Sequence, residues 1–178
     1  MDAHTERIKD HGRKKDMYDK FGEFDSWEEI NRAAQGLKEE GDEKSLVALA
    51  IENGIDKEDA EDYIDGAVDK LCNPLIAALG KIAVEEKELK PKDIMEDWVN
   101  YIRTLCSEDE NIALGVRKKD KNLKGCIGQL LSWSFKHQQN VDKDIIKAAG
   151  ISANKVTLGI PGIRTAHQLI KEYYGGAR

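Results

Sequence analysis

The segment ENGIDKEDAEDYIDG, Glu52 to Gly66, combines a helix end, a turn and the start of a new helix. Gly54 can adopt the left-handed conformation that commonly follows a helix end. Asp56 is a residue type that caps the first turn of a helix. The pattern therefore predicts a short helix over residues 45–53 and a third helix in the chain that runs from Asp56 to about Cys72.

Similar start and stop signals recur on both sides of this segment. Further helices are predicted to begin at the Ser26–Glu29 and Ser107–Glu110 capping boxes, at Asn73-Pro74, at Pro91, near Leu123, at Asp142 and after Pro161. Apolar residues follow the helical period in most of these segments, and alternation typical of strands is nearly absent. We expect an all-α fold, a compact bundle of about eight to nine short helices, with a short extended segment near Val156–Gly162.

The chain divides by charge into parts with different properties. Residues 1–20 are polar and without a helical period, which predicts a flexible polar arm. Residues 21–72 carry 5 basic and 16 acidic side chains and form an acidic helical N-terminal part. Residues 73–178 form a helical C-terminal part with a basic surface, because residues 112–178 carry 12 basic and 4 acidic side chains. Together the two helical parts are expected to form one domain or two packed subdomains, and their opposite charges suit either two kinds of partner or pairing with each other.

Several classes of protein find no support in the composition. No apolar run approaches the roughly 18 residues that a membrane span needs, and the N-terminus lacks the apolar core of a secretory signal. We expect a cytoplasmic protein with no membrane contact. The cysteines, Cys72, Cys106 and Cys126, are far apart and form no CxxC motif, so buried free thiols in a reducing compartment are predicted. The histidines make no ligand spacing with these cysteines.

The acidic segment has two readings as a site. A calcium-binding loop that starts at Asp56 needs Gly at its sixth position and Glu at its twelfth, but Glu61 and Ala67 stand there. A start at Asp62 fails as well, because Ala67 then takes the sixth position, so neither a metal nor a cofactor is expected. A helix fits better and places five carboxylates on one face: Glu58, Glu61, Asp62, Asp65 and Asp69. This acidic face is either a solvated surface or a binding surface for a cationic groove on another macromolecule.

A basic cluster follows in the last third of the chain. It consists of Arg117, Lys118, Lys119, Lys121 and Lys124. Cations in such a group suit contacts with nucleic-acid phosphates, and the alternative is a solvated loop. No catalytic motif accompanies either cluster: the chain has no nucleophile elbow, no phosphate-binding glycine loop and no paired metal-binding histidines, so it is not expected to be an enzyme.

Four strings of the sequence carry a resemblance to a known family. They are GIDKEDAEDYIDG, ELKPKDIMEDWVNYIRTLC, VRKKDKNLKGCIGQLLSWSFK and VTLGIPG, followed by a terminal helix ending in KEYY. Over residues 18–174 the chain resembles a family of small proteins of phages and mobile elements from gut Firmicutes that includes a broad-spectrum type II-A anti-CRISPR protein. The string KNLKGCIGQLL is also faintly similar to the PcfK-like proteins of conjugative plasmids.

The resemblance implies an inhibitor that binds a guide-loaded type II CRISPR effector nuclease in the bacterial host cell, blocks cleavage of target DNA, and also contacts DNA. A homodimer is compatible with the long helices. The alternative is a DNA-binding accessory or regulatory protein of a phage or conjugative element, which the basic excess of the last third favours. The family supplies no residue roles for this chain, so the candidate residues are the acidic face and the basic cluster.

Overall fold

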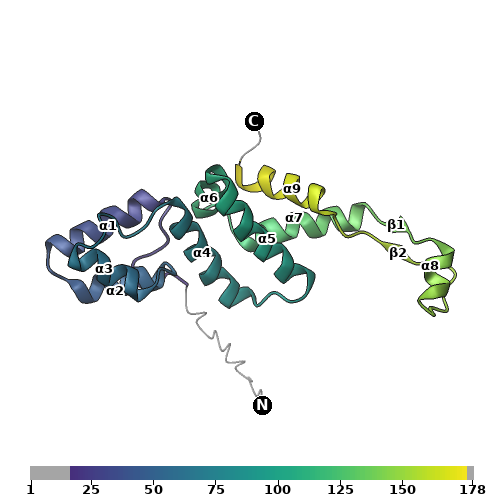
Figure 1. The fold of residues 1–178 in the computed structure, drawn as a ribbon, viewed down its shortest axis with the longest axis horizontal. Helices are drawn as coiled ribbons and strands as arrows, with labels where there is room; N and C mark the ends of the chain where they lie inside the picture. The colour runs from purple at the N-terminus through teal and green to yellow at the C-terminus, as the bar shows by residue number, and fades with distance from the viewer. Residues whose placement is uncertain (1–16, 176–178) are drawn as a thin grey trace, which may run out of the picture.

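The fold of residues 17–175, the range described here from a computed structural model, is almost entirely helical (Figure 1). Residues 1–16 of the predicted polar arm lie outside this range. The elements are α1 (Trp27–Glu39), α2 (Glu43–Glu52), α3 (Lys57–Asp65), α4 (Pro74–Leu89), α5 (Ile94–Glu108), α6 (Glu110–Arg117), α7 (Leu123–Lys136), β1 (Gln139–Asn140), α8 (Lys143–Ala148), β2 (Thr157–Leu158) and α9 (Ile163–Gly175). Within the described range this makes nine helices and one two-stranded antiparallel sheet, which confirms the predicted all-α class.

Side-chain caps explain most of the helix starts. The Ser26 hydroxyl accepts a hydrogen bond from the Glu29 amide at 3.2 Å and begins α1. Glu29 reaches back to the Asp25 amide at 2.8 Å, one residue earlier than a standard capping box requires. The Asn73 side chain accepts from the Ile76 amide at 2.8 Å, and Pro74 occupies the first turn of α4. The structure therefore confirms the helix starts that the sequence predicts at Ser26 and at Asn73-Pro74.

Two other boundaries differ from the sequence predictions. Helix α5 begins at Ile94, behind Asp93, and not at Pro91. Ser107 caps nothing, because α5 continues through Glu108. The cap of α6 is Asp109, whose carboxylate accepts from the Asn111 amide at 2.9 Å. An aspartate side chain can accept a hydrogen bond from the amide two residues ahead, whereas a serine capping box uses the amide three residues ahead.

Two hydrophobic clusters stabilise the molecule, and α4 contributes to both. The first cluster joins α1, α2 and α3 and includes Ile30, Leu46 and Ala77. The second joins α4, α5, α6, α7 and α9 around Ile82, Ile102, Leu130 and Ile170. In Figure 1, α4 accordingly lies between the α1–α3 group and the remaining helices. The predicted division at residues 72 and 73 stays a prediction, since a shared helix connects the two clusters.

One segment extends away from the bundle. Strands β1 and β2 pair in the register Gln139–Leu158 and Asn140–Thr157, and α8 lies between them at the far end (Figure 1). We call residues 139–158 the projecting hairpin. The predicted extended segment is therefore present, but the bundle is less compact than expected.

The cysteines lie in the two clusters. Cys72, Cys106 and Cys126 are buried free thiols, as predicted. Burial raises the pKa of each thiol to about 12, because the thiolate is poorly solvated among apolar side chains.

Candidate interaction surfaces

The acidic helix α3 is shorter than its sequence predicts. It ends at Asp65, because Gly66 adopts a φ of 78° and the Ala67 amide donates back to the Asp62 carbonyl at 2.9 Å. This left-handed ending is the one that glycine adopts most easily. The predicted extension to Cys72 is therefore wrong, and Val68, which follows the helix end, is exposed.

The early end of α3 divides the predicted acidic face. All five carboxylates are exposed. Glu58, Asp62 and Asp65 are spaced four and three residues apart and share one side of the helix. Glu61 forms an ion pair with Lys57 at 2.6 Å.

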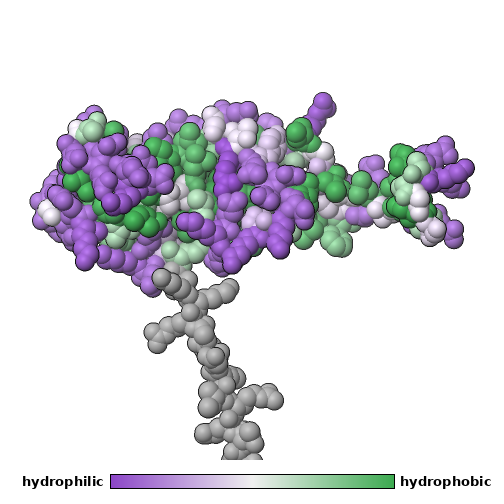
Figure 2. All heavy atoms as spheres, turned by 60° about the horizontal axis from the view of Figure 1, so that its bottom comes forward, coloured by the Kyte–Doolittle hydropathy of each residue, from purple (hydrophilic) through white to green (hydrophobic). Residues whose placement is uncertain are grey.

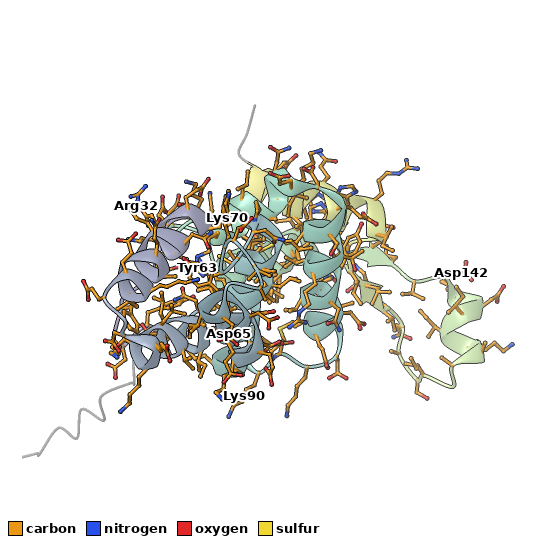
Figure 3. All side chains as sticks on the ribbon, turned by 60° about the vertical axis from the view of Figure 1, so that its left-hand side comes forward. Arg32, Tyr63, Asp65, Lys70, Lys90 and Asp142 are labelled. Carbon is orange, nitrogen blue, oxygen red and sulfur yellow. The ribbon has the colours of Figure 1, made fainter. Side chains whose placement is uncertain are left out.

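Asp69 follows the helix end and lies next to α1. It lines a surface hollow of about 480 Å³ together with Gln35 and Tyr63. Asp65 lines a different hollow, of about 510 Å³, between α2 and α3. Figure 3 shows Asp65 on the opposite side of Tyr63 from Arg32 and Lys70. The sequence placed Asp69 on the same face as the other four, and the structure corrects this.

A lysine offsets the negative charge at the end of α3. Lys38 donates from Nζ to the Tyr63 carbonyl at 2.5 Å and lies 4.5 Å from the centre of the Tyr63 ring. A cation at a helix C-terminus is favourable, whereas the Asp65 carboxylate at the same end is not. Asp65 thus remains the acidic residue whose position the helix itself does not stabilise.

The basic cluster is only partly a surface. Arg117 is the last residue of α6 and its side chain is 1% exposed. Its Nη2 donates to Asn53 Oδ1 at 2.7 Å, and its guanidinium carbon lies 5.8 Å from the centre of the Tyr18 ring. The prediction that Arg117 contacts nucleic acid is wrong for this fold, because the side chain cannot reach a phosphate.

The lysines of the cluster also contact the protein itself. Lys118 forms an ion pair with Asp25 at 3.3 Å, and Lys124 forms one with Glu88 at 2.9 Å. Lys121 Nζ lies 5.0 Å from the centre of the Tyr173 ring. Lys119 donates through its backbone amide to Asp25 at 3.0 Å. Three of the four lysine side chains therefore contact the protein itself, whereas Lys119 does so through its backbone. Lys118, Lys119 and Lys121 lie in the segment between α6 and α7, which we call the basic connection, and Lys124 lies in α7.

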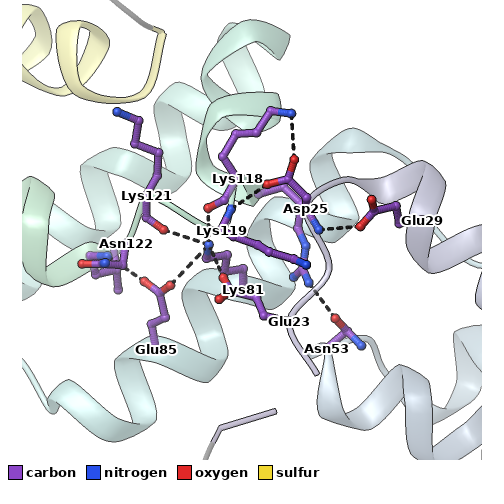
Figure 4. Close-up of polar contacts among 12 residues, drawn as sticks. Glu23, Asp25, Glu29, Asn53, Lys81, Glu85, Lys118, Lys119, Lys121 and Asn122 are labelled. Atoms are coloured by element: carbon purple, nitrogen blue, oxygen red, sulfur yellow. Dashed lines mark hydrogen bonds and ion pairs between the residues drawn. The ribbon is translucent and has the colours of Figure 1, made fainter. Parts of the chain in front are cut away.

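Lys81 lies at the centre of a buried polar network that the sequence did not predict (Figure 4). Its Nζ donates to the carbonyls of Lys118 and Lys121 at 2.6 and 2.8 Å. The same atom lies 2.7 Å from Glu23 and 3.8 Å from Glu85. A fully buried ammonium therefore has two carboxylates and two carbonyls around it, and it fixes the basic connection onto α4.

Glu85 completes the network. Its Oε2 accepts from the Leu123 amide at 2.6 Å, at the start of α7. Burial raises the pKa of this carboxyl, while the Leu123 amide and the Lys81 ammonium lower it. Glu85 also lines a cavity of about 380 Å³ with Tyr18 and Leu123, and burial raises the pKa of Tyr18 to about 12. Within this cavity the Glu85 carboxylate is bound by the Leu123 amide, whereas the buried Tyr18 hydroxyl has no hydrogen-bond partner among the described residues.

The helical spacing of α4 contained a signal for this network. Lys81 and Glu85 are four residues apart and fall among Ala77, Ala78 and Ile82. Two opposite charges at that spacing on an apolar face indicate a buried pair.

The link between Asp25 and the basic connection leads to a prediction about pH. The Lys119 amide is the main cause that lowers the pKa of Asp25, and the Lys118 side chain adds to it. A folded-state pKa below the ordinary value stabilises the fold above that ordinary value, and the contribution is lost as pH falls through the folded-state pKa. We expect Asp25→Asn to lower the free energy of unfolding near about pH 6 and to differ little from the parent near about pH 2. Chemical denaturation at both pH values checks this, and a difference that persists in acid would show that charge is not the cause.

Residues 17–175 show neither a membrane-spanning helix nor a metal-binding cluster. In this range no helix is both long enough and apolar enough to cross a lipid bilayer. Nor do three or more His, Cys, Asp or Glu side chains of this range come together in an arrangement that could hold a metal ion.

Comparisons with known proteins identify no relative. No protein-family model matches the chain, and neither a curated protein nor a solved structure matches it at a significant level.

Proposed function

We propose that this protein is a non-catalytic inhibitor that binds a guide-loaded type II CRISPR effector nuclease and blocks cleavage of target DNA in the bacterial cytoplasm. The observation that carries the proposal is the acidic face of α3. Glu58, Asp62 and Asp65 are exposed, and none of them forms an ion pair within the described part of the chain. A nuclease of this class has positively charged channels for guide and target strands, and such a channel is complementary to a row of carboxylates. The sequence resemblance of residues 18–174 supplies the class of partner.

The alternative, a DNA-binding accessory protein of a mobile element, has less support from the basic cluster than its sequence suggested. Arg117 is buried, and Lys118 and Lys124 are ion-paired. A phosphate contact would have to compete with these pairs. DNA binding is therefore the competing hypothesis.

Binding of the purified protein to immobilised, guide-loaded nuclease tests the proposal. We expect the double variant Asp62→Asn, Asp65→Asn to reduce affinity by about tenfold or more, because each lost charge removes an attraction to the cationic channel. The affinity of the parent should fall as salt rises.

A matched control removes two exposed charges elsewhere. Glu96→Gln, Asp97→Asn changes the net charge equally on α5, away from α3, and should leave the affinity nearly unchanged. Equal losses in both double variants would indicate a general effect of net charge and would contradict a specific role for the acidic face.

A further inference from the structure

The projecting hairpin is held together by backbone hydrogen bonds and packs on α7 at its base. In addition to the two strand pairs, the Val141 amide donates to the Val156 carbonyl at 2.9 Å. Gly159, just beyond the hairpin, packs so closely on α7 that a β-carbon there would lie 2.3 Å from the Ser134 carbonyl oxygen. Gln138 donates to the same carbonyl at 2.8 Å. The direction in which the hairpin leaves the body is thus set by packing at its base.

Exposed apolar side chains concentrate on this hairpin and its base. The described range contains 12 large hydrophobic residues that are exposed, and seven of them lie here. We call these seven the hairpin surface: Leu131, Phe135, Ile145, Ile151, Leu158, Ile160 and Ile163. Phe135 and Ile163 are each 76% exposed. Figure 2 shows hydrophobic side chains gathered on the narrow base and on part of the tip. A concentration of this kind marks a binding surface, whereas single exposed apolar residues are ordinary.

Cations without partners surround the hairpin surface. The exposed residues Lys136, Lys143, Lys147, Lys155 and Arg164 form no ion pair within residues 17–175. Five lysines elsewhere in the described range do form ion pairs: Lys57, Lys81, Lys118, Lys124 and Lys171. The only acidic residues among them are Asp142 and Asp144, and the Asp142 carboxylate is engaged with the Asp144 amide as the cap of α8. An apolar centre with a cationic rim is complementary to an apolar surface with an anionic rim.

The residue types distinguish among possible partners. Single-stranded nucleic acid is bound through cations together with aromatic stacking, but Phe135 is the only aromatic residue among the seven, and the neighbouring Trp133 is already stacked on His137. A second copy that used the same surface would bring two cationic rims together, which is unfavourable. The acidic helix α3 of the same molecule is at the opposite end of the structure, so it cannot cover the hairpin (Figure 1).

We propose that the hairpin surface docks on a protein whose own surface is apolar at its centre and rimmed by carboxylates. Resting on the function proposed above, this protein is the guide-loaded nuclease. The inhibitor would then contact it at two separate regions, with the acidic face of α3 at one end and the hairpin surface at the other. Two such contacts in one molecule favour each other, because the second forms without a further loss of translational freedom.

Variants at the most exposed positions test the inference. Phe135→Ser combined with Ile163→Ser should lower the affinity for immobilised, guide-loaded nuclease by about tenfold or more, with an unchanged circular-dichroism spectrum. The reversal Lys143→Glu, Lys147→Glu should slow association and reduce its dependence on salt. Met95→Ser, at an exposed apolar residue on α5, is the matched control and should bind as the parent does.

The outcomes separate this inference from the proposed function. If the parent binds the nuclease and the Phe135→Ser, Ile163→Ser variant binds equally well, the hairpin inference is wrong and the proposed function stands. If these changes instead weaken binding to a duplex DNA alone, or shift sedimentation from dimer to monomer while nuclease binding is unchanged, the partner is nucleic acid or a second copy and the inference is overturned. A parent protein that binds no guide-loaded nuclease contradicts both.

Discussion

Replacing Lys81 with methionine is expected to lower the free energy of unfolding by about 3–5 kcal/mol. The Lys81 side chain is fully buried, with Glu23 at 2.7 Å and Glu85 at 3.8 Å from its ammonium nitrogen. Methionine fills a similar volume but leaves the Glu85 carboxylate buried without its cation. It also removes the donor for the carbonyls of Lys118 and Lys121, which are otherwise held against α4. Urea denaturation followed by circular dichroism measures the loss.

The same substitution at an exposed pair provides the control. Lys57 pairs with Glu61 at 2.6 Å on the surface of α3, and both side chains are at least half exposed. We expect Lys57→Met to change the free energy of unfolding by no more than about 0.5 kcal/mol, because water replaces the lost partner. A Lys81→Met variant within about 1 kcal/mol of the parent would mean that the network is not needed to hold the basic connection in place.

Gly115→Ala is the second substitution with a large expected effect. Gly115 lies in α6 where this helix meets α9, and a β-carbon there would lie 1.9 Å from the Tyr174 carbonyl oxygen. The obstacle is backbone, so the two helices must move apart or bend. We expect a net loss of about 1–3 kcal/mol from this overpacking, which exceeds the gain from replacing glycine by a better helix former.

Gly128→Ala measures the gain in helix preference without the overpacking. Gly128 is inside α7, and a β-carbon there would meet no atom within 4 Å. Only the helix preference remains, so this variant should be more stable than the parent by up to about 1 kcal/mol. Thermal denaturation of both variants gives the comparison. A stabilised Gly115→Ala protein would show that α6 and α9 do not pack as described.

Local signals in the sequence were sufficient for most of the helices. Helix caps act within one turn, as Ser26, Asn73 and Pro74 do, so their effect can be predicted without the rest of the chain. The end of α3 was missed because Gly66 lies inside a segment whose apolar spacing continues as if the helix did. The left-handed Gly66 ends the helix despite that spacing, so Asp69 does not lie on the acidic face.

Contacts between distant segments decided the rest of the candidate sites. Arg117 belongs to a run of cations in the sequence. Its side chain points inward and binds Asn53, which lies 64 residues earlier, and no local pattern predicts this contact. Leu131 and Ile163 likewise belong to segments whose apolar residues follow the helical period. Both are exposed, because β1, α8 and β2 project outward and leave no element to cover them. Periodicity indicates that a helix has an apolar side, but the tertiary arrangement decides which part of that side is buried.

Cleavage of a matched target DNA by guide-loaded type II nucleases, measured with increasing amounts of this protein, tests the proposed function most directly. The proposal predicts that a small molar excess abolishes cleavage by at least one nuclease, and that Asp62→Asn, Asp65→Asn requires about tenfold more protein for the same effect. Complete cleavage at a large excess of the parent protein, across several nucleases of this type, would contradict it.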